Sequence, residues 1–227
     1  GGSKDWGDTS PYHRLGKQAF DARATAFALG NSGAGFGAQA GQLKGGLGSA
    51  SIMLDADVCV GALLAVNPVG AVCDAHGTFW VQHLALNHNG TPEFGRAYAP
   101  APQAGASHPL VASKLAGLAA GANTTIGVVA VAADLTPAEC QRVAIMAQDG
   151  LARAIRPVHT PFDGDAIFVL ATGSKPLARA KEMRPLALTV LGALAADCVA
   201  RAIARAVWFA DDTGFAPAYR SRFPKAE

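Results

Sequence analysis

The sequence predicts a layered domain of the α/β or α+β class. Patterns typical of buried strands alternate with patterns typical of helices along the 227 residues, and no internal repeat is present. Half of the side chains are hydrophobic and the mean hydropathy is +0.21, which is enough apolar material for a sizeable core. With 49 alanines, 26 glycines and only 7% aromatic residues, the layers of this core are expected to approach closely.

The first third of the chain predicts a helix, a glycine-rich loop and two strands. After a polar, turn-rich opening, the alanine-rich residues 19–29 favour a short helix that ends at Gly30. Residues 30–48 contain so many glycines that their backbone can approach whatever lies opposite. Residues 49–54 and 58–66 have strand patterns, and the second is a continuous apolar run of the kind found in sheets buried on both faces.

The middle of the chain predicts a hairpin, a strand and a well-capped helix. Residues 74–109 mix Gly, Pro, Asn and His and are expected to form a hairpin followed by a long exposed connection. Residues 126–132 form the next buried-strand pattern. Thr136 and Glu139 then have the spacing of a capping box, with Pro137 at the first helical position, so a helix begins there.

The last third predicts one more strand, over 165–170, and a long apolar helix over 186–210. The longest uninterrupted apolar run, 186–196, is shorter than the roughly 20 residues that a membrane span requires. No membrane helix is therefore expected.

Charge and cysteine content restrict the function classes. A net charge of +2 with 16% charged residues leaves little basic surface for a nucleic acid, so none is expected as a partner. The four cysteines form no CxxC pair, which indicates neither a zinc knuckle nor a disulfide framework. A reducing compartment fits this usage, and we expect a cytoplasmic protein.

Familiar catalytic and cofactor motifs are incomplete. Gly35, Gly37 and Ala40 match GxGxxA, but the loop lacks the preceding strand and the later acidic residue of a dinucleotide site. The six histidines form no HExxH, and no GxSxG elbow is present. Neither a cofactor nor a metal is therefore expected.

A short polar stretch, Asn123-Thr124-Thr125, directly precedes the strand over 126–132. Taken alone, it is typical of a strand start rich in β-branched residues. A threonine hydroxyl is a poor nucleophile at neutral pH, but cleavage of the peptide bond before Thr124 would change that. The new α-amino group, with a pKa of about 7.7–8.0, would act as general base for the neighbouring hydroxyl.

Five sequence blocks in one order carry a family resemblance. They are residues 30–38 (GNSGAGFGA), 43–51 (LKGGLGSAS), 65–67 (AVN), 123–129 (NTTIGVV) and 163–165 (DGD). Together they resemble the self-processing N-terminal-nucleophile amidohydrolases, which include L-aminopeptidase/D-esterase, β-aminopeptidases and 6-aminohexanoate (nylon) oligomer hydrolase. Threonine after Asn123 and the Asp-Gly-Asp turn resemble the nylon-oligomer hydrolase branch most.

The resemblance implies a four-layer αββα sandwich in which Thr124 leads an inner strand and the N-terminal part of the usual domain is absent. It also implies self-cleavage between Asn123 and Thr124. Residues 1–123 would then be part of the α-chain and residues 124–227 the β-chain, which together form one domain.

The resemblance further assigns roles to four other residues. Lys44 would lie beside Thr124 and help to hold it and the developing negative charge, and Asn67 would donate a hydrogen bond to the oxyanion. Asp163 and Asp165 would orient the Thr124 amine and Lys44. Spacing alone favours ordinary structural roles for the same residues. Lys44 would be a solvated loop lysine, and Asn67 a turn residue before Pro68. Asp163 and Asp165 would form an Asx turn before a strand.

The function implied is hydrolysis of linear amides, with endo-type action on 6-aminohexanoate oligomers and assembly of the two-chain units into a homotetramer. An aminopeptidase or β-aminopeptidase of the same family is the nearest alternative. A non-catalytic small-molecule-binding protein, with the glycine-rich loop as an anion cradle, is the alternative from another class. The residues that would bind a substrate are not assigned.

Overall fold

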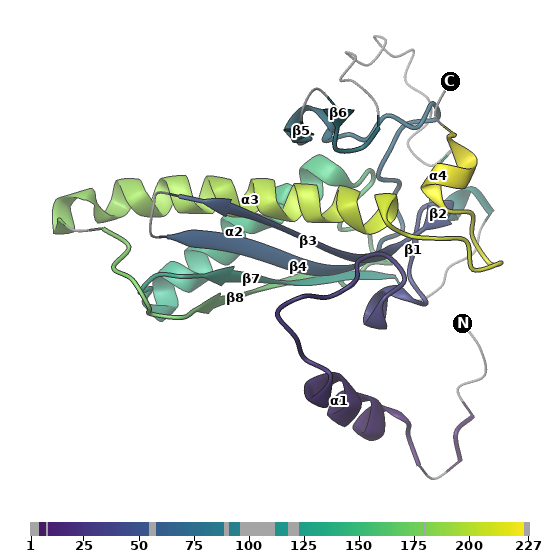
Figure 1. Ribbon diagram of the computed structural model, residues 1–227, viewed down its shortest axis with the longest axis horizontal. Coiled ribbons are helices and arrows are strands. Elements are labelled where there is room, and N and C mark those ends of the chain that lie inside the picture. The colour runs from purple at the N-terminus through teal and green to yellow at the C-terminus, as the bar shows by residue number, and fades with distance from the viewer. Residues whose placement is uncertain are drawn as a thin grey trace.

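A twisted four-stranded sheet lies at the centre of the computed structural model, which describes residues 5–7, 9–54, 58–88, 91–95, 112–117, 123–178 and 180–224 (Figure 1). The strand order is β3-β4-β7-β8. Neighbouring strands are antiparallel except for the parallel pair β7 and β8. The strand bounds are Gly46–Met53 (β3), Cys59–Asn67 (β4), Thr124–Val131 (β7) and Ala166–Ala171 (β8). Each overlaps a predicted strand, and β7 is an inner strand as expected.

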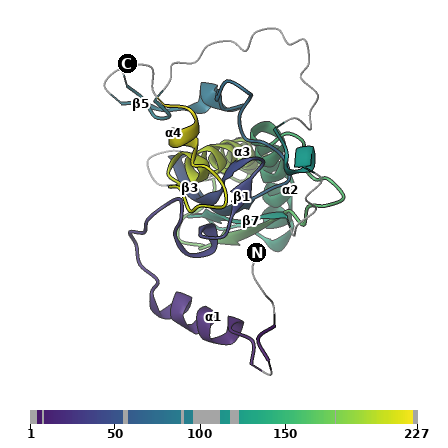
Figure 2. The same cartoon turned by 90° about the vertical axis from the view of Figure 1, so that its right-hand side faces the viewer.

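Two helices cover one face of this sheet, α2 (Pro137–Ala154) and α3 (Arg184–Trp208), and they also pack against each other (Figures 1 and 2). Helix α2 begins with the predicted capping box. Thr136 Oγ1 accepts a hydrogen bond from the Glu139 amide, and the Glu139 carboxylate accepts one from the Thr136 amide. The α2 crossover joins β7 to β8, which is why those two strands are parallel.

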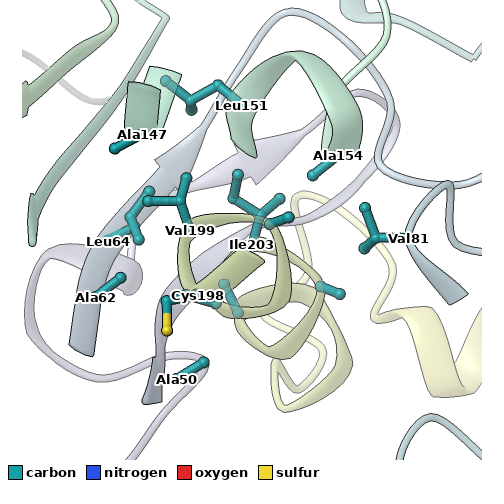
Figure 3. Packing of buried hydrophobic residues seen from close by; sticks show 14 of the residues in the cluster. Ala50, Ala62, Leu64, Val81, Ala147, Leu151, Ala154, Cys198, Val199 and Ile203 are labelled. Carbon is teal, nitrogen blue, oxygen red and sulfur yellow. The ribbon is translucent and has the colours of Figure 1, made fainter. Parts of the chain in front are cut away.

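The core lies between the sheet and the two helices, and small side chains fill it (Figure 3). Alternate residues of each strand, such as Ala62 and Leu64 in β4, point toward α3, where Val199 and Ile203 are fully buried. Glycines allow part of α3 to approach the sheet backbone. A Cβ on Gly48 would lie 1.9 Å from the Ala202 carbonyl oxygen, so no larger residue fits there. The predicted close packing of layers is confirmed.

The opposite face of the sheet, here called the open face, carries exposed apolar side chains. They are Leu63, Ile126, Val128, Phe168 and Leu170, each at least 40% exposed. In the described ranges the only other sheets are two-stranded: β1 (Gln39–Ala40) with β2 (Leu43–Lys44), and β5 (Asn87–His88) with β6 (Thr91–Pro92). The described residues thus form one sheet and one helical layer of an α/β arrangement.

The remaining elements are short and lie at the periphery. They are α1 (Tyr12–Asp21), α4 (Tyr219–Arg222) and the 3-10 turns Gly33–Gly35, Gln82–Leu84, Lys114–Gly117 and Lys181–Met183. Strands β5 and β6 form the hairpin predicted within 74–109. The long connection predicted after it falls on residues 96–111, which lie outside the described residues.

The helix predicted over 19–29 is wrong in position. Helix α1 occupies Tyr12–Asp21 instead, and none of its residues is buried (Figure 1). Pro11 fits the cap position at its start, and Lys17 pairs with Asp21 one turn later. The polar composition of the opening residues therefore concealed a helix whose stabilising contacts are local.

Helix α3 and the turn before it, Lys181–Trp208, are long and apolar enough to cross a membrane by length and composition alone. The uninterrupted apolar run over 186–196 is shorter than the helix, because Asp197, Arg201 and Arg205 follow it within the same helix. In the structure, however, 56% of the most apolar window is buried inside the protein, where the helix lines the core. Its composition is accounted for by packing against β3, β4 and α2.

Candidate active site

Thr124 begins β7 at the end of the sheet where β4 finishes, and it pairs directly with Asn67 across the two strands. Its side chain is partly buried and lies on the open face, as the alternation along β7 requires. Its hydroxyl donates a hydrogen bond of 2.5 Å to the carbonyl oxygen of Asn123, the preceding residue. The nucleophile predicted from sequence is therefore in contact with the peptide group that it is predicted to attack.

The loop before β8 closes over this peptide group. Asn123 forms an isolated parallel bridge with Asp163, and the Gly164 amide donates a 3.0 Å hydrogen bond to the Asn123 carbonyl oxygen. A Cβ on Gly164 would lie 2.9 Å from Thr124 Oγ1. A larger residue at position 164 would therefore displace the Thr124 hydroxyl or the loop. Two donors, a hydroxyl and an amide, polarise the Asn123 carbonyl.

Asp165 anchors the first residues of β7. Its carboxylate is almost fully buried, with 1% of the side chain exposed. One oxygen accepts a 2.7 Å hydrogen bond from the Thr125 amide, and the other lies 2.9 Å from Nδ1 of His159. A buried carboxylate with two partners holds its loop rigidly beside the Thr124 backbone.

Asp163 ties the same loop to the end of β4. One carboxylate oxygen accepts a 3.0 Å hydrogen bond from the Val69 amide. The other accepts hydrogen bonds from the Thr160 amide at 3.0 Å and the Thr160 hydroxyl at 2.6 Å. Both predicted aspartates thus lie at the site and hold backbone there. Their predicted action on a free Thr124 amine stays a prediction.

Lys44 is completely buried, and the glycine-rich loop folds around its amine. The ammonium donates to the carbonyl oxygens of Gly35 at 2.6 Å, Gly45 at 2.8 Å and Ala38 at 3.0 Å. Desolvation by burial lowers the pKa of Lys44 from 10.5 to about 8. Among the described residues, these three carbonyls are the recorded acceptors of its amine. The loop therefore presents carbonyl oxygens to a cation, which is the opposite of an anion cradle.

Asn67 is held by two donors on its carboxamide oxygen. The Gln39 amide donates at 3.0 Å, and the amine of Lys114 donates at 3.0 Å. These contacts fix which end of the carboxamide is the acceptor, so its NH₂ group is turned away from both donors. That orientation is compatible with the predicted donation to an oxyanion.

Lys114 was not predicted as a site residue, and it lies at the centre of the cluster. Its amine also donates to Asn123 Oδ1 at 2.8 Å, and its backbone amide donates to the Val69 carbonyl at 3.0 Å. Burial lowers its pKa to about 8, and the nearby Asp163 carboxylate opposes that shift. No motif marks this lysine, because only the folded chain brings it beside Asn67 and Asn123.

The structure thus gathers Thr124, Asn67, Asn123, Asp163 and Asp165 at one end of the sheet, with Lys114, His159 and Gly164 as unpredicted neighbours. Lys44 lies on the other side of β4 from this cluster. It comes two residues before Gly46 of β3, which pairs with Val66 of β4. The next residue of β4, Asn67, pairs with Thr124 of β7. In the part of the chain that the structure describes, no three His, Cys, Asp or Glu side chains are grouped as metal ligands.

Comparison with solved structures defines the class of fold. The protein resembles a β-aminopeptidase from Burkholderia sp. with a TM-score of 0.58 and 23% identity, over 95% of this chain and 57% of that one. It also resembles the L-aminopeptidase D-Ala-esterase/amidase of Ochrobactrum anthropi, with a TM-score of 0.53 and 23% identity, over 89% and 52% of the two chains. The latter is described as a variant of the Ntn hydrolase fold. The fold is therefore Ntn-hydrolase-like, as predicted.

The family follows from the sequence itself. The model of peptidase family S58 matches residues 7–218, which is most of the chain. The protein belongs to peptidase family S58, and the family predicted from the five ordered blocks is confirmed.

Two curated relatives match this chain with different identities. An uncharacterized aminopeptidase of Mycobacterium leprae is 45% identical over 207 residues, which cover 88% of this chain and 54% of that protein. A 6-aminohexanoate-oligomer endohydrolase of Agromyces sp. is 27% identical over 215 residues, which cover 86% and 56%. The chain thus spans little more than half the length of these relatives, and its identity to the aminopeptidase is the higher.

Proposed function

We propose that this protein is a self-processing amide hydrolase in which Thr124 becomes an N-terminal nucleophile. The contact between the Thr124 hydroxyl and the Asn123 carbonyl carries this proposal. The Gly164 amide on the same carbonyl oxygen supports it, because an N–H at that position would stabilise the negative charge that develops during attack.

Self-cleavage would proceed by transfer of the Asn123 acyl group from nitrogen to oxygen. The Thr124 hydroxyl oxygen attacks the Asn123 carbonyl carbon, the carbon–nitrogen bond breaks, and the hydroxyl proton ends on the departing amine. Water then hydrolyses the ester, which leaves a carboxylate on Asn123 and a free α-amino group on Thr124.

Turnover would reuse the same oxygen with the new amine as general base. The Thr124 hydroxyl attacks a substrate amide carbonyl and forms an acyl-enzyme ester as the amine product leaves, and water releases the acyl group. Asn67, opposite Thr124 in the sheet, is the proposed oxyanion donor, and Asp165 is proposed to hold the strand that carries the new amine.

The substrate that we propose is an amide with a free N-terminal amine, as an aminopeptidase requires. The higher identity to the mycobacterial aminopeptidase supports this choice. Endo-type cleavage of 6-aminohexanoate oligomers is the second candidate, supported by the Agromyces relative and by Thr124 following Asn123.

N-terminal sequencing and intact mass of the purified full-length protein test the cleavage. A fragment that begins Thr-Thr-Ile-Gly-Val is the expected result. Thr124→Ala should leave the chain intact and inactive, because it removes the nucleophilic oxygen together with one methyl group. Thr125→Val is the matched control, since the neighbouring Thr125 hydroxyl is buried without a recorded partner. A wild-type chain that stays uncut, or a Thr124→Ala chain that is cut, would contradict the proposal.

Paired substrates separate the two substrate classes. The free-amine and N-acetylated forms of one amide oligomer are compared under the same conditions. An aminopeptidase cleaves only the free-amine form, whereas an endo-acting hydrolase tolerates the acetyl group.

A further inference from the structure

Lys114 has a partly buried amine, and the nucleophile assignment leaves this amine without a role. It begins the short 3-10 turn Lys114–Gly117, and its backbone amide is fixed on the Val69 carbonyl just after β4. Val69 is in turn held by the Asp163 carboxylate through its own amide. The lysine is therefore attached to the same frame as the loop that closes over Thr124.

All recorded acceptors of the Lys114 amine belong to the two residues that flank the nucleophile. Asn123 precedes Thr124 in the chain and supplies Oδ1 at 2.8 Å. Asn67 faces Thr124 across the strands and supplies Oδ1 at 3.0 Å and its carbonyl oxygen at 3.4 Å. One ammonium thus links the residue whose carbonyl is attacked to the residue proposed as oxyanion donor.

We propose that Lys114 is a positioning residue for Thr124, which holds the Asn67 carboxamide and the Asn123 side chain in register during self-cleavage and turnover. This inference rests on the proposed function. Its physical reason is that a carboxamide can rotate about its last bond, and a charged donor on its oxygen fixes the direction of the NH₂ end.

The same ammonium also suits the product of cleavage. Breaking the Asn123–Thr124 bond converts the Asn123 carbonyl into a carboxylate, within the residue that Lys114 already contacts. A cation at that place stabilises the new negative charge. An uncharged residue at position 114 would leave the new carboxylate near Asp163 without that cation.

The experiment measures the rate at which the full-length protein forms the fragment that begins at Thr124. Lys114→Met removes the donor and the charge, Lys114→Arg keeps both, and Lys17→Met, on exposed helix α1, is the matched control. We expect Lys114→Met to slow self-cleavage by about tenfold or more, Lys114→Arg to recover most of that loss, and Lys17→Met to match the wild type.

Turnover gives the readout that a merely structural lysine would not change. In the cleaved enzyme, with an amino-acid p-nitroanilide as probe, Lys114→Met should lower kcat and leave KM within about twofold, because it acts on the transition state. The effects of Lys114→Met and Asn67→Ala on kcat should also be strongly non-additive, since the lysine acts through the asparagine.

The outcomes separate the two proposals. A wild-type chain that never cleaves overturns the proposed function and this inference together. A wild type that cleaves, with folded Lys114→Met cleaving equally fast or with additive effects of the two substitutions, overturns the role of Lys114 alone. If Lys114→Met does not fold, Lys114→Gln retains a shorter neutral donor, and wild-type rates in that variant would also overturn the role.

Discussion

Two lysine amines near the end of the sheet have similarly lowered pKa values but different hydrogen-bond partners. The amine of Lys44 is enclosed by three backbone carbonyls of the glycine-rich loop, and that of Lys114 binds the side chains of Asn67 and Asn123. Burial lowers both pKa values to about 8. A perturbed pKa therefore does not by itself mark a residue as part of the chemistry. The partners of each amine separate the two roles. Lys44 stabilises the glycine-rich loop, whereas Lys114 contacts residues next to Thr124.

The largest expected effect is the loss of stability on removing the Lys44 amine. Lys44→Met removes a charged donor from three carbonyls, of which those of Gly35 and Ala38 keep a backbone amide donor. We expect the free energy of unfolding to fall by about 3 kcal/mol. Urea denaturation measures this loss, and exposed Lys17→Met should stay within roughly 0.5 kcal/mol of the wild type.

The Lys44→Met variant also tests whether Lys44 acts on the glycine-rich loop or on Thr124. If Lys44→Met keeps wild-type stability and loses self-cleavage, then Lys44 acts beside Thr124, as the family resemblance implies. Stabilising the glycine-rich loop is then not its main function. If stability falls and the remaining folded protein cleaves normally, then Lys44 acts only on the loop.

A smaller effect is expected from crowding the nucleophile directly. Gly164→Ala places a Cβ 2.9 Å from Thr124 Oγ1, which must shift relative to the Asn123 carbonyl. Self-cleavage should slow by about tenfold to a hundredfold, because small displacements of reacting groups are costly. Gly16→Ala, where an added Cβ meets open space, is the matched control. Unchanged cleavage in folded Gly164→Ala would show that the observed contact is not the reactive one.

The smallest effect is a pH dependence of stability. Lysine has a pKa of 10.5 when exposed and Lys44 one of about 8 in the folded protein. Between these values the unfolded chain binds more protons, so stability rises with pH. The wild type should gain roughly 1 kcal/mol per pH unit over Lys44→Met between about pH 8 and pH 10.5.

Relative to Lys114→Met, the wild type should gain stability with pH at a similar slope, because the pKa of Lys114 is also lowered to about 8 despite the opposing charge of Asp163. Burial raises the pKa of Cys198 to about 12, an effect of opposite sign that is common to all variants and cancels in the difference. Urea denaturation repeated across this pH range measures both slopes. Differences that do not vary with pH would contradict the assignment of these pKa values to the two lysines.

Local signals predicted most of the fold. The continuous apolar runs of β4 and β7 and the capping box of α2 depend on neighbouring residues, so the sequence displays them directly. Helix α1 was misplaced because its composition resembles a loop and no core contact marks it. The apolar composition of α3 predicts a long helix that lies inside layers or at a subunit contact, and only the fold shows that it lies against the sheet.

The site was predicted in part for the same reason. Thr124, Asn67 and the two aspartates lie in ordered sequence blocks, and the structure brings them together. Lys114 lies in no such block, and its proximity to Asn67 and Asn123 depends on where β4 ends and β7 begins. The partners of Asp163 and Asp165 likewise follow from the loop closing over the strand, which residue spacing does not encode.

The alternation along β7 sets Thr124 on the same side of the sheet as Ile126 and Val128. Any layer that shields those two hydrocarbon side chains from water also dries the surroundings of the hydroxyl and strengthens each dipole aimed at it. Solvent exclusion over this side of the sheet would then stabilise the protein and activate its chemistry in one event, so that a chain unable to cover its apolar surface is also a poor catalyst.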